Sequence, residues 1–175
     1  MLKRLPDRLD PWRFADLGNE VGGQIPLDSM SRLSECLLDT AGEASFELQF
    51  ARDERRRAVM TGWLKAELTL ECQRCLEAVR LPVETHVSVA FVERHDQAEQ
   101  LPDYLDPIMV EENQVRFVDL IEDELLLQLP QVAMHEEGTC PVPLVEMFED
   151  KPAEPSAQPA RNPFAVLAEL KGKKD

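Results

Sequence analysis

Residues 58–92 have the sequence AVMTGWLKAELTLECQRCLEAVRLPVETHVSVAFV, and this stretch decides the fold. Apolar and polar residues alternate on both sides of its central tetrapeptide, Cys72-Gln73-Arg74-Cys75. The residues that share the apolar face are Leu64, Ala66, Leu68, Leu70 and Cys72 before the turn, and Val79, Leu81, Val83, Thr85, Val87, Val89 and Phe91 after it. Because side chains of a strand point alternately to opposite faces, this period of two predicts two half-buried strands. We therefore predict a long antiparallel hairpin with Cys-x-x-Cys at its tip.

Two further elements complete the expected core. Residues 44–50 predict another strand, because every second residue there is apolar. Residues 119–129 predict an apolar helix: Asp119 and Glu122 form a pair that resembles a capping box, and Pro130 ends the pattern. A helix with this much apolar surface is expected to pack across the sheet.

These elements predict one α+β domain over residues 1–149, in which an antiparallel sheet around the hairpin of about 58–92 is packed by the helix of about 119–129. Residues 150–161 are rich in proline and alanine and predict a linker. Residues 162–175 predict a short tethered helix with a basic tip.

The start of that C-terminal helix is marked by Asn162 as its cap and Pro163 at its first position. Its apolar residues lie near one face and are candidate partner-binding residues: Phe164, Leu167 and Leu170. A helix this short is marginal alone, so we expect it to dock. Docking on its own domain and docking on a partner remain equal alternatives.

The remaining segments carry weaker signals. Residues 1–26 hold three prolines and three glycines, and we expect an extended arm there rather than a long regular element. Asp28 or Ser29 is expected to cap a helix that ends at Gly42, with Cys36 as a small buried residue on its apolar face.

Residues 94–107 are polar and predict a loop, followed by a short strand pair around residues 111–114. On the helix of 119–129, the acids Glu122 and Asp123 are interpreted as favourable charges near the helix N-terminus. An acid–base role is disfavoured because no matched nucleophile lies near them in the sequence.

Charge is distributed unevenly along the 175 residues, whose net charge is −15. Residues 1–80 carry 12 basic and 14 acidic side chains, residues 81–160 carry 3 and 18, and residues 161–175 carry 4 and 2. This balance argues against attraction of the whole chain to nucleic acid, but it allows a local cationic patch. No apolar run reaches membrane-spanning length, so we expect a cytoplasmic protein without membrane contact.

The local cationic patch has a candidate in the segment that precedes the hairpin. Four of its six residues are arginines: Arg52, Arg55, Arg56 and Arg57. Guanidinium groups match phosphate oxygens in two-point geometry, which favours a phosphate-contacting loop. The alternative is an ordinary charged hairpin turn, in which Asp53 and Glu54 offset two of the positive charges.

The cysteines offer three alternatives. Cys72 and Cys75 at a hairpin tip resemble a zinc knuckle, and His135 with Cys140 could complete four ligands for a structural metal. Reduced thiols without a metal are an equal alternative. Thioredoxin-like redox chemistry is disfavoured, because strand alternation resumes after Cys75 where a helix would be needed. Four cysteines in a chain of this length do not indicate a disulfide framework.

The sequence also lacks a glycine-rich phosphate loop, a nucleophile elbow and the HExxH motif. Nor does it show clustered acidic and histidine ligands of a metal-dependent nuclease. These residues by themselves indicate no specific function.

An ordered set of segments nevertheless resembles the bacterial YceD family nearly from end to end. These segments are Leu9-Asp-Pro11, Leu70-Glu-Cys-Gln-Arg-Cys75, Leu120-Ile-Glu-Asp-Glu-Leu-Leu-Leu-Gln-Leu-Pro130 with His135 and Cys140, and Asn162-Pro-Phe-Ala-Val-Leu-Ala-Glu-Leu-Lys171. The resemblance implies a non-catalytic ribosome-biogenesis factor that affects synthesis, processing or stability of 23S ribosomal RNA. An enzyme or enzyme regulator linked to nuclease action, and a zinc-stabilised protein-interaction module, are the alternatives.

The resemblance also implies partners and contact residues. We expect contact with 23S ribosomal RNA or a pre-50S particle, and the acidic half favours an additional basic ribosomal protein or assembly factor. The candidate RNA-binding residues are Arg52, Arg55, Arg56, Arg57, Arg74, Lys171, Lys173 and Lys174.

Overall fold

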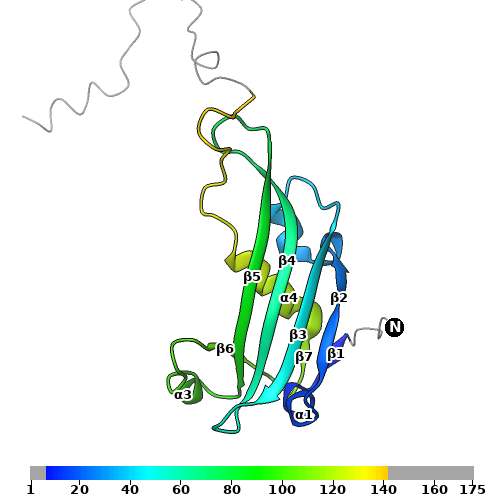
Figure 1. The fold of residues 1–175 in the computed structure, drawn as a ribbon, viewed down its shortest axis with the longest axis vertical. Coiled ribbons are helices and arrows are strands. Elements are labelled where there is room, and N and C mark those ends of the chain that lie inside the picture. Colours follow the sequence, from blue (N-terminus) through cyan, green and yellow to red (C-terminus); the bar gives the residue numbers. More distant parts are fainter. Residues whose placement is uncertain (1–6, 142–175) are drawn as a thin grey trace, which may run out of the picture. The chain divides into compact units, whose positions relative to one another are not determined.

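A computed structural model describes residues 7–141 of the protein, and it has the expected α+β architecture (Figure 1). Its main feature is a sheet of five strands in the order β2-β3-β4-β5-β6. The strands are β2 (Glu20–Pro26), β3 (Glu43–Arg52), β4 (Ala58–Glu71), β5 (Ala78–Val92) and β6 (Asp106–Met109). The first four are antiparallel, and β6 runs parallel to β5.

Smaller elements surround this sheet. A two-stranded ladder joins β1 (Arg8–Leu9) to β7 (Val115–Arg116). The helices are α1 (Pro11–Asp16), α2 (Ser31–Cys36), α3 (His95–Ala98) and α4 (Phe117–Leu127), and a 3-10 turn spans Leu27–Ser29. Within residues 7–141, no helix has the length and apolar character needed to cross a membrane.

The predicted hairpin is confirmed. β4 and β5 pair from Val59 opposite Ala90 to Glu71 opposite Ala78. The inward side chains of the sheet form the core with α4, and the largest fully buried ones include Phe46, Phe50, Leu64, Leu68 and Val87 from the strands. The ring of Phe46 lies 5.2 Å from that of Phe117 at the start of α4, between ring centroids. α4 therefore covers one face of the sheet, as its apolar stripe predicts.

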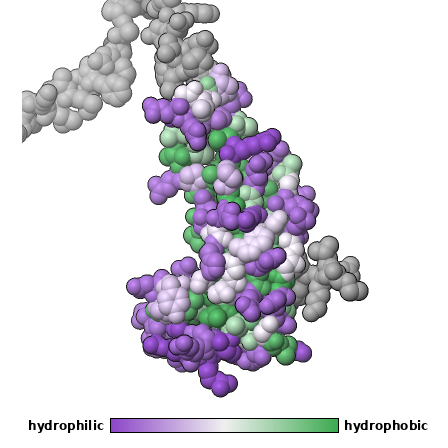
Figure 2. All heavy atoms as spheres, viewed as in Figure 1, coloured by the Kyte–Doolittle hydropathy of each residue, from purple (hydrophilic) through white to green (hydrophobic). Residues whose placement is uncertain are grey.

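The opposite face of the sheet remains largely polar. Figure 2 shows mainly hydrophilic and intermediate side chains over it, with apolar ones between them. The indole N–H of Trp63 donates to Glu47 at 3.1 Å, and the ammonium group of Lys65 lies 5.3 Å from the centre of the Trp63 ring. A cross-strand hydrogen bond and a cation–aromatic contact of this kind are typical of a polar sheet face.

The first 26 residues are more regular than expected. The prediction of an extended arm is wrong, because they contain α1 and the seven-residue strand β2. Asp10 caps α1 by accepting a hydrogen bond from the Arg13 N–H at 3.0 Å, and Pro11 opens the helix. Pairing with β3 holds β2 in the sheet despite its two glycines, since tertiary pairing overrides weak strand propensity.

α2 also differs from its prediction. Neither Asp28 nor Ser29 caps it, because both lie in the preceding 3-10 turn, and its cap residue is Met30. The helix ends at Cys36, whose side chain is exposed and donates to the Arg32 carbonyl at 3.5 Å. The expectation of a buried Cys36 was therefore wrong: of this helix, Leu33 is the residue that lies in the core.

The segment between β5 and α4 contains two corrections. The predicted loop of 94–107 includes α3 and the beginning of β6. The predicted strand pair around 111–114 does not form, because β6 joins β5 and β7 joins β1 instead. Glu112 and Asn113 adopt left-handed backbone conformations, with φ of 52° and 58°, and separate the two strands.

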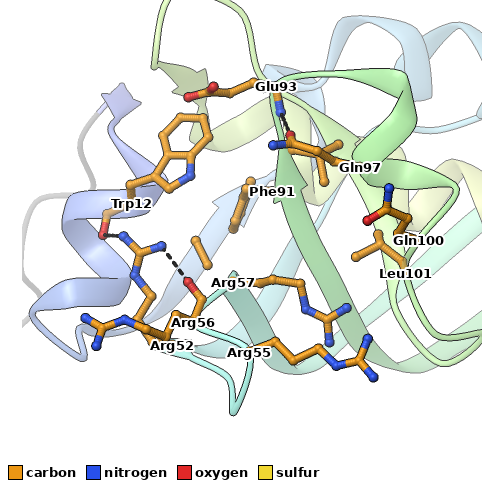
Figure 3. Close-up of a pocket in the computed structure, with 12 residues that line it drawn as sticks. Trp12, Arg52, Arg55, Arg56, Arg57, Phe91, Glu93, Gln97, Gln100 and Leu101 are labelled. Atoms are coloured by element: carbon orange, nitrogen blue, oxygen red, sulfur yellow. Dashed lines mark hydrogen bonds between the residues drawn. The ribbon is translucent and has the colours of Figure 1, made fainter.

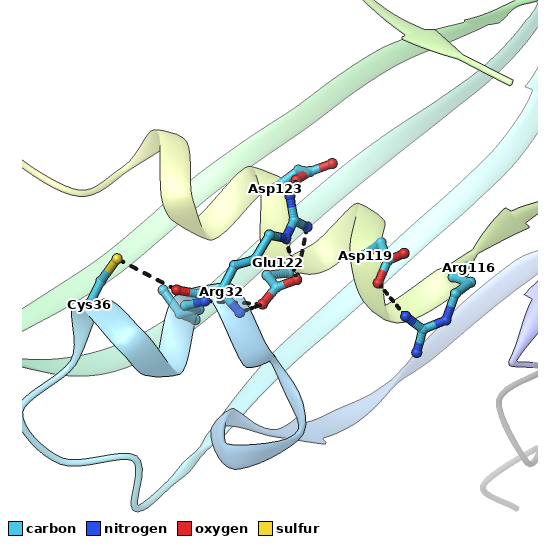
Figure 4. A network of polar contacts seen from close by, with 7 residues as sticks. Arg32, Cys36, Arg116, Asp119, Glu122 and Asp123 are labelled. Carbon is cyan, nitrogen blue, oxygen red and sulfur yellow. Dashed lines mark hydrogen bonds and ion pairs between the residues drawn. The ribbon is translucent and has the colours of Figure 1, made fainter.

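α4 begins at Phe117, two residues before the predicted cap. Asp119 pairs with the Arg116 guanidinium at 3.1 Å instead of forming a capping box. Glu122 is buried and accepts hydrogen bonds from the N–H groups of Arg32 and Leu33 at 2.7 and 3.0 Å (Figure 4). Its carboxylate therefore caps α2 from the neighbouring helix, and the interpretation that it serves the α4 dipole was wrong.

The same contacts explain the ionisation of Glu122. Burial acts to raise its pKa, but the hydrogen bonds from Leu33 and Arg32, together with the Arg32 charge at 2.8 Å, outweigh burial and lower the pKa. Such a group stabilises the fold fully above its unfolded pKa of about 4.3, and this contribution is lost as the pH falls through the lower folded pKa.

We predict that Glu122→Gln lowers the free energy of unfolding by about 1.5–3 kcal/mol at pH 7, since charged hydrogen bonds are lost. The difference from the parent should shrink as the pH falls through the folded pKa of Glu122. Urea denaturation across this range measures both effects. Asp123→Asn is the matched control, because Asp123 also contacts Arg32, at 2.6 Å, but is 55% exposed. Equal losses in the two variants would contradict the capping role.

A close strand approach occurs at Gly62 in β4. A Cβ atom there would lie 2.9 Å from the Leu48 Cα and still closer to the Glu47 carbonyl oxygen. Neither atom belongs to a side chain that can rotate away, so β4 and β3 would have to separate. At Gly22 in β2, by contrast, the nearest atoms are 3.4 Å away.

We predict that Gly62→Ala destabilises the fold by about 3 kcal/mol or more, which is the upper range for overpacking. Gly22→Ala, in the adjoining edge strand, should change the free energy of unfolding by less than about 1 kcal/mol. Chemical denaturation of both variants tests the difference, and a Gly62→Ala protein as stable as the parent would refute the close approach.

Candidate functional site

The hairpin tip meets the chain that follows α4. The turn at the tip is closed by hydrogen bonds from the Cys72 N–H to the Glu77 carbonyl at 2.9 Å and from the Leu76 N–H to the Cys72 carbonyl at 2.8 Å. The Gln73 N–H donates to the Ala133 carbonyl at 2.8 Å, which fastens the following loop to the tip. Four side chains meet there with their ligand atoms within 4.8 Å of one another: Cys72, Cys75, His135 and Cys140.

His135 is oriented at the centre of this cluster. Its Nδ1 lies 3.4 Å from the Cys75 sulfur and 3.9 Å from the Cys140 sulfur. Its Nε2 lies 3.1 Å from the Ala78 carbonyl oxygen, which can only accept a hydrogen bond. That contact places the proton on Nε2 and leaves the Nδ1 lone pair directed at the sulfurs.

The sulfur atoms differ in their ionisation. Burial opposes ionisation of Cys72, but hydrogen bonds from the backbone N–H groups of His135, Cys75 and Arg74 lower its pKa to about 5. Burial raises the pKa of Cys75, and the neighbouring sulfurs of Cys72 and Cys140 raise it further. A hydrogen bond from the Glu77 N–H lowers this pKa, but it does not outweigh the other effects. Because burial and the neighbouring sulfurs disfavour the charged form of Cys75, a cation bound at the cluster would favour its thiolate.

The cluster fits a tetrahedral zinc ion. Thiolate and imidazole ligands at about 2.1–2.3 Å from zinc lie about 3.6–3.8 Å from one another, close to the distances between His135 and the two sulfurs. The carbonyl of Ala78 supplies the outer hydrogen bond that zinc-binding histidines usually have. Arg74 adds positive charge, with its guanidinium 3.9 Å from the Cys140 sulfur.

The arginine loop, residues 52–57, lies at the other end of β4. Arg52 is held by Asp16 at 2.7 Å and by the Arg56 carbonyl at 3.0 Å. Arg57 pairs with Asp53 at 2.6 Å, and Asp53 also accepts the N–H of Arg55 at 2.9 Å. Arg55 and Arg56 are exposed and form no ion pair with any residue in 7–141.

This loop borders an open cavity of about 420 Å³ (Figure 3). The other walls come from α1, the end of β5 and the α3 region, and their lining residues include Trp12, Phe91, Glu93, Gln97 and Gln100. Sequence reasoning missed these residues. No periodic signal connects them to the arginines, because they meet only when α1 and α3 pack at the same end of the sheet.

Several predicted residues belong to the C-terminal part of the chain. The linker of 150–161 and the C-terminal helix of 162–175 lie outside the described residues. So do the candidate contact residues Phe164, Leu167, Leu170, Lys171, Lys173 and Lys174.

Comparison with known proteins connects the chain to a family. The family model for "Large ribosomal RNA subunit accumulation protein YceD" matches residues 60–171, from the hairpin to the C-terminal segment. A Haemophilus influenzae protein of the same name is 35% identical over 172 residues, which cover 97% of this chain and 98% of that protein. No solved structure matches the chain. These matches show that the chain belongs to the YceD family.

Proposed function

We propose that this protein is a non-catalytic ribosome-biogenesis factor of the cytoplasm that promotes accumulation of 23S ribosomal RNA by binding this RNA or a pre-50S particle. The similarity to the Haemophilus influenzae protein, over 97% of the chain, carries the proposal. The guanidinium groups of Arg55 and Arg56, which are exposed and form no ion pair within residues 7–141, support direct contact with phosphates.

A binding role is favoured over an enzymatic one by the cysteine cluster. Catalytic zinc sites keep a coordination position open for water or substrate, whereas structural sites use four protein ligands. Here the protein supplies all four: Cys72, Cys75, His135 and Cys140. The cluster therefore supports a structural role rather than nuclease chemistry.

We propose that this cluster binds a structural zinc ion. The ion would join the hairpin tip to the loop after α4, because two ligands come from each. That joint would also hold Arg74 in place as a candidate RNA contact at the tip. The thiolate charge would be balanced by the metal and by the neighbouring guanidinium.

The RNA-facing surface would occupy only part of the molecule. Arg55 and Arg56 supply the free charges, while Arg52 and Arg57 shape the loop through their ion pairs. Residues 81–160, with 3 basic and 18 acidic side chains, would instead suit a basic ribosomal protein or assembly factor. The C-terminal lysines are proposed as a further RNA contact, and Phe164, Leu167 and Leu170 as a contact with a protein partner.

For the metal, we predict about one zinc ion per chain in protein purified without chelator. Cys75→Ser should lower the zinc content and the melting temperature, because a ligand of the joint is lost. Cys36→Ser is the matched control, since Cys36 lies outside the cluster and is exposed. Elemental analysis and thermal denaturation measure the two effects. Four reactive thiols and clearly less than one zinc per chain would refute the site.

For the RNA contact, we predict that Arg55→Glu with Arg56→Glu reduces co-sedimentation with pre-50S particles at least about tenfold. For binding to single-stranded RNA, the slope of the logarithm of the binding constant against the logarithm of the salt concentration should become less negative by about 1.4. This is the change expected for two lost phosphate contacts. Lys65→Glu with Arg80→Glu changes the charge equally on the polar sheet face and serves as the control.

Unchanged co-sedimentation of the Arg55/Arg56 variant would remove the arginine loop as the RNA contact. Failure of the parent protein to associate with 23S ribosomal RNA or with any pre-50S particle would reject the proposed function itself. Degradation of a 23S precursor by the purified parent, abolished by a single acid or cysteine substitution, would require the enzymatic alternative.

A further inference from the structure

The arginine loop has an unexpected residue at its tightest position. The Arg56 N–H donates to the Asp53 carbonyl at 2.9 Å, and the Asp53 N–H donates to the Arg57 carbonyl at 3.1 Å. Arg56 has a left-handed backbone with φ of 63°. A three-residue hairpin loop of this form normally places glycine at the left-handed position. An arginine there is less favourable for folding than glycine, so its side chain is expected to serve another purpose.

Arg56 also lines the open cavity beside the loop. Figure 3 shows Arg55 and Arg57 along one side of its rim, and Arg56 with Arg52 along the other. The unpaired guanidinium groups thus lie on both sides of the opening. Two successive phosphates of a nucleic acid strand could each meet one of them, while the nucleoside between them faces inward.

The far wall of the cavity suits a nucleobase rather than a second phosphate. Trp12 is only partly buried and lines this wall, and base stacking on an aromatic ring is a main source of affinity for single strands. Glu93 also lies there, away from Arg55, and a carboxylate accepts hydrogen bonds from base amino groups. The side-chain oxygen Oε1 of Gln97 accepts the Glu93 N–H at 2.9 Å, which leaves the side-chain NH2 group of Gln97 as a donor.

We propose that this cavity binds one nucleotide of single-stranded RNA, with its flanking phosphates on Arg55 and Arg56 and its base against the Trp12 indole. This inference deepens the proposed function and rests on it. The volume of about 420 Å³ lies within the range of small-ligand sites. A duplex is excluded because its bases are stacked and paired, so none can turn into the cavity.

Trp12 fluorescence provides a direct test. The chain has two tryptophans, so Trp63→Phe leaves Trp12 as the sole reporter. We expect a single-stranded RNA of about eight nucleotides to quench it, and the matching duplex and adenosine monophosphate to do so only at much higher concentration. In the same background, Trp12→Leu should weaken RNA binding about fivefold or more, as judged by anisotropy of labelled RNA.

The variant Arg56→Gly tests whether the arginine side chain serves RNA binding rather than folding. It should weaken RNA binding several-fold while leaving the melting temperature equal or higher, because glycine relieves the left-handed backbone. Arg80→Gln, on the polar sheet face, is the control and should bind RNA like the parent.

Three results would overturn the inference: RNA that binds without quenching Trp12, an Arg56→Gly or Trp12→Leu protein that binds RNA as tightly as the parent, or tighter binding of the duplex or of free adenosine monophosphate. If these occurred while the parent still co-sedimented with pre-50S particles, the proposed function would stand without the nucleotide site. If the parent protein itself did not co-sediment with pre-50S particles, the proposed function would be rejected instead.

Discussion

The pairing of β4 with β5 is the constraint on which the rest of the structure depends. The ladder runs from Val59 to Glu71 on one strand, and its alternating side chains form one wall of the core. A shift of one residue would turn the buried face to solvent, so burial specifies this register strongly. The same ladder brings Cys72 and Cys75 to one end of the hairpin and leaves the arginine loop at the other.

The hairpin therefore separates two sites of different chemistry. β4 has 14 residues and spans about 45 Å at the usual rise of a strand. The cysteine cluster at the tip is compact and offers four side chains that could hold a metal ion, which suits a structural joint. The arginine loop borders an open cavity and carries two exposed arginines without an ion pair among the described residues, which suits a ligand. A stiff sheet between them would let the protein present both ends to one large particle.

The contact between Glu122 and α2 organises the helices that pack on the core face of the sheet. A buried carboxylate costs free energy unless its oxygens are satisfied, and Glu122 meets this condition with two backbone N–H groups and the Arg32 guanidinium. The contact fixes α4 to a helix of only six residues, which has little stability alone. One ionised side chain thus joins α4 to α2.

The sequence by itself determined the elements whose pattern is local: the β4–β5 hairpin, β3, the apolar character of α4, and the four residues of the cysteine cluster as candidates for one site. Only the tertiary structure decided which distant groups meet. It brought Trp12 to the arginine loop, gave Glu122 its partners on α2, exposed Cys36, and placed β6 beside β5 rather than β7. Periodicity reports which face of an element is buried, because that depends on spacing along the chain. It does not report what that face contacts, because the partner is chosen by packing between segments far apart in sequence.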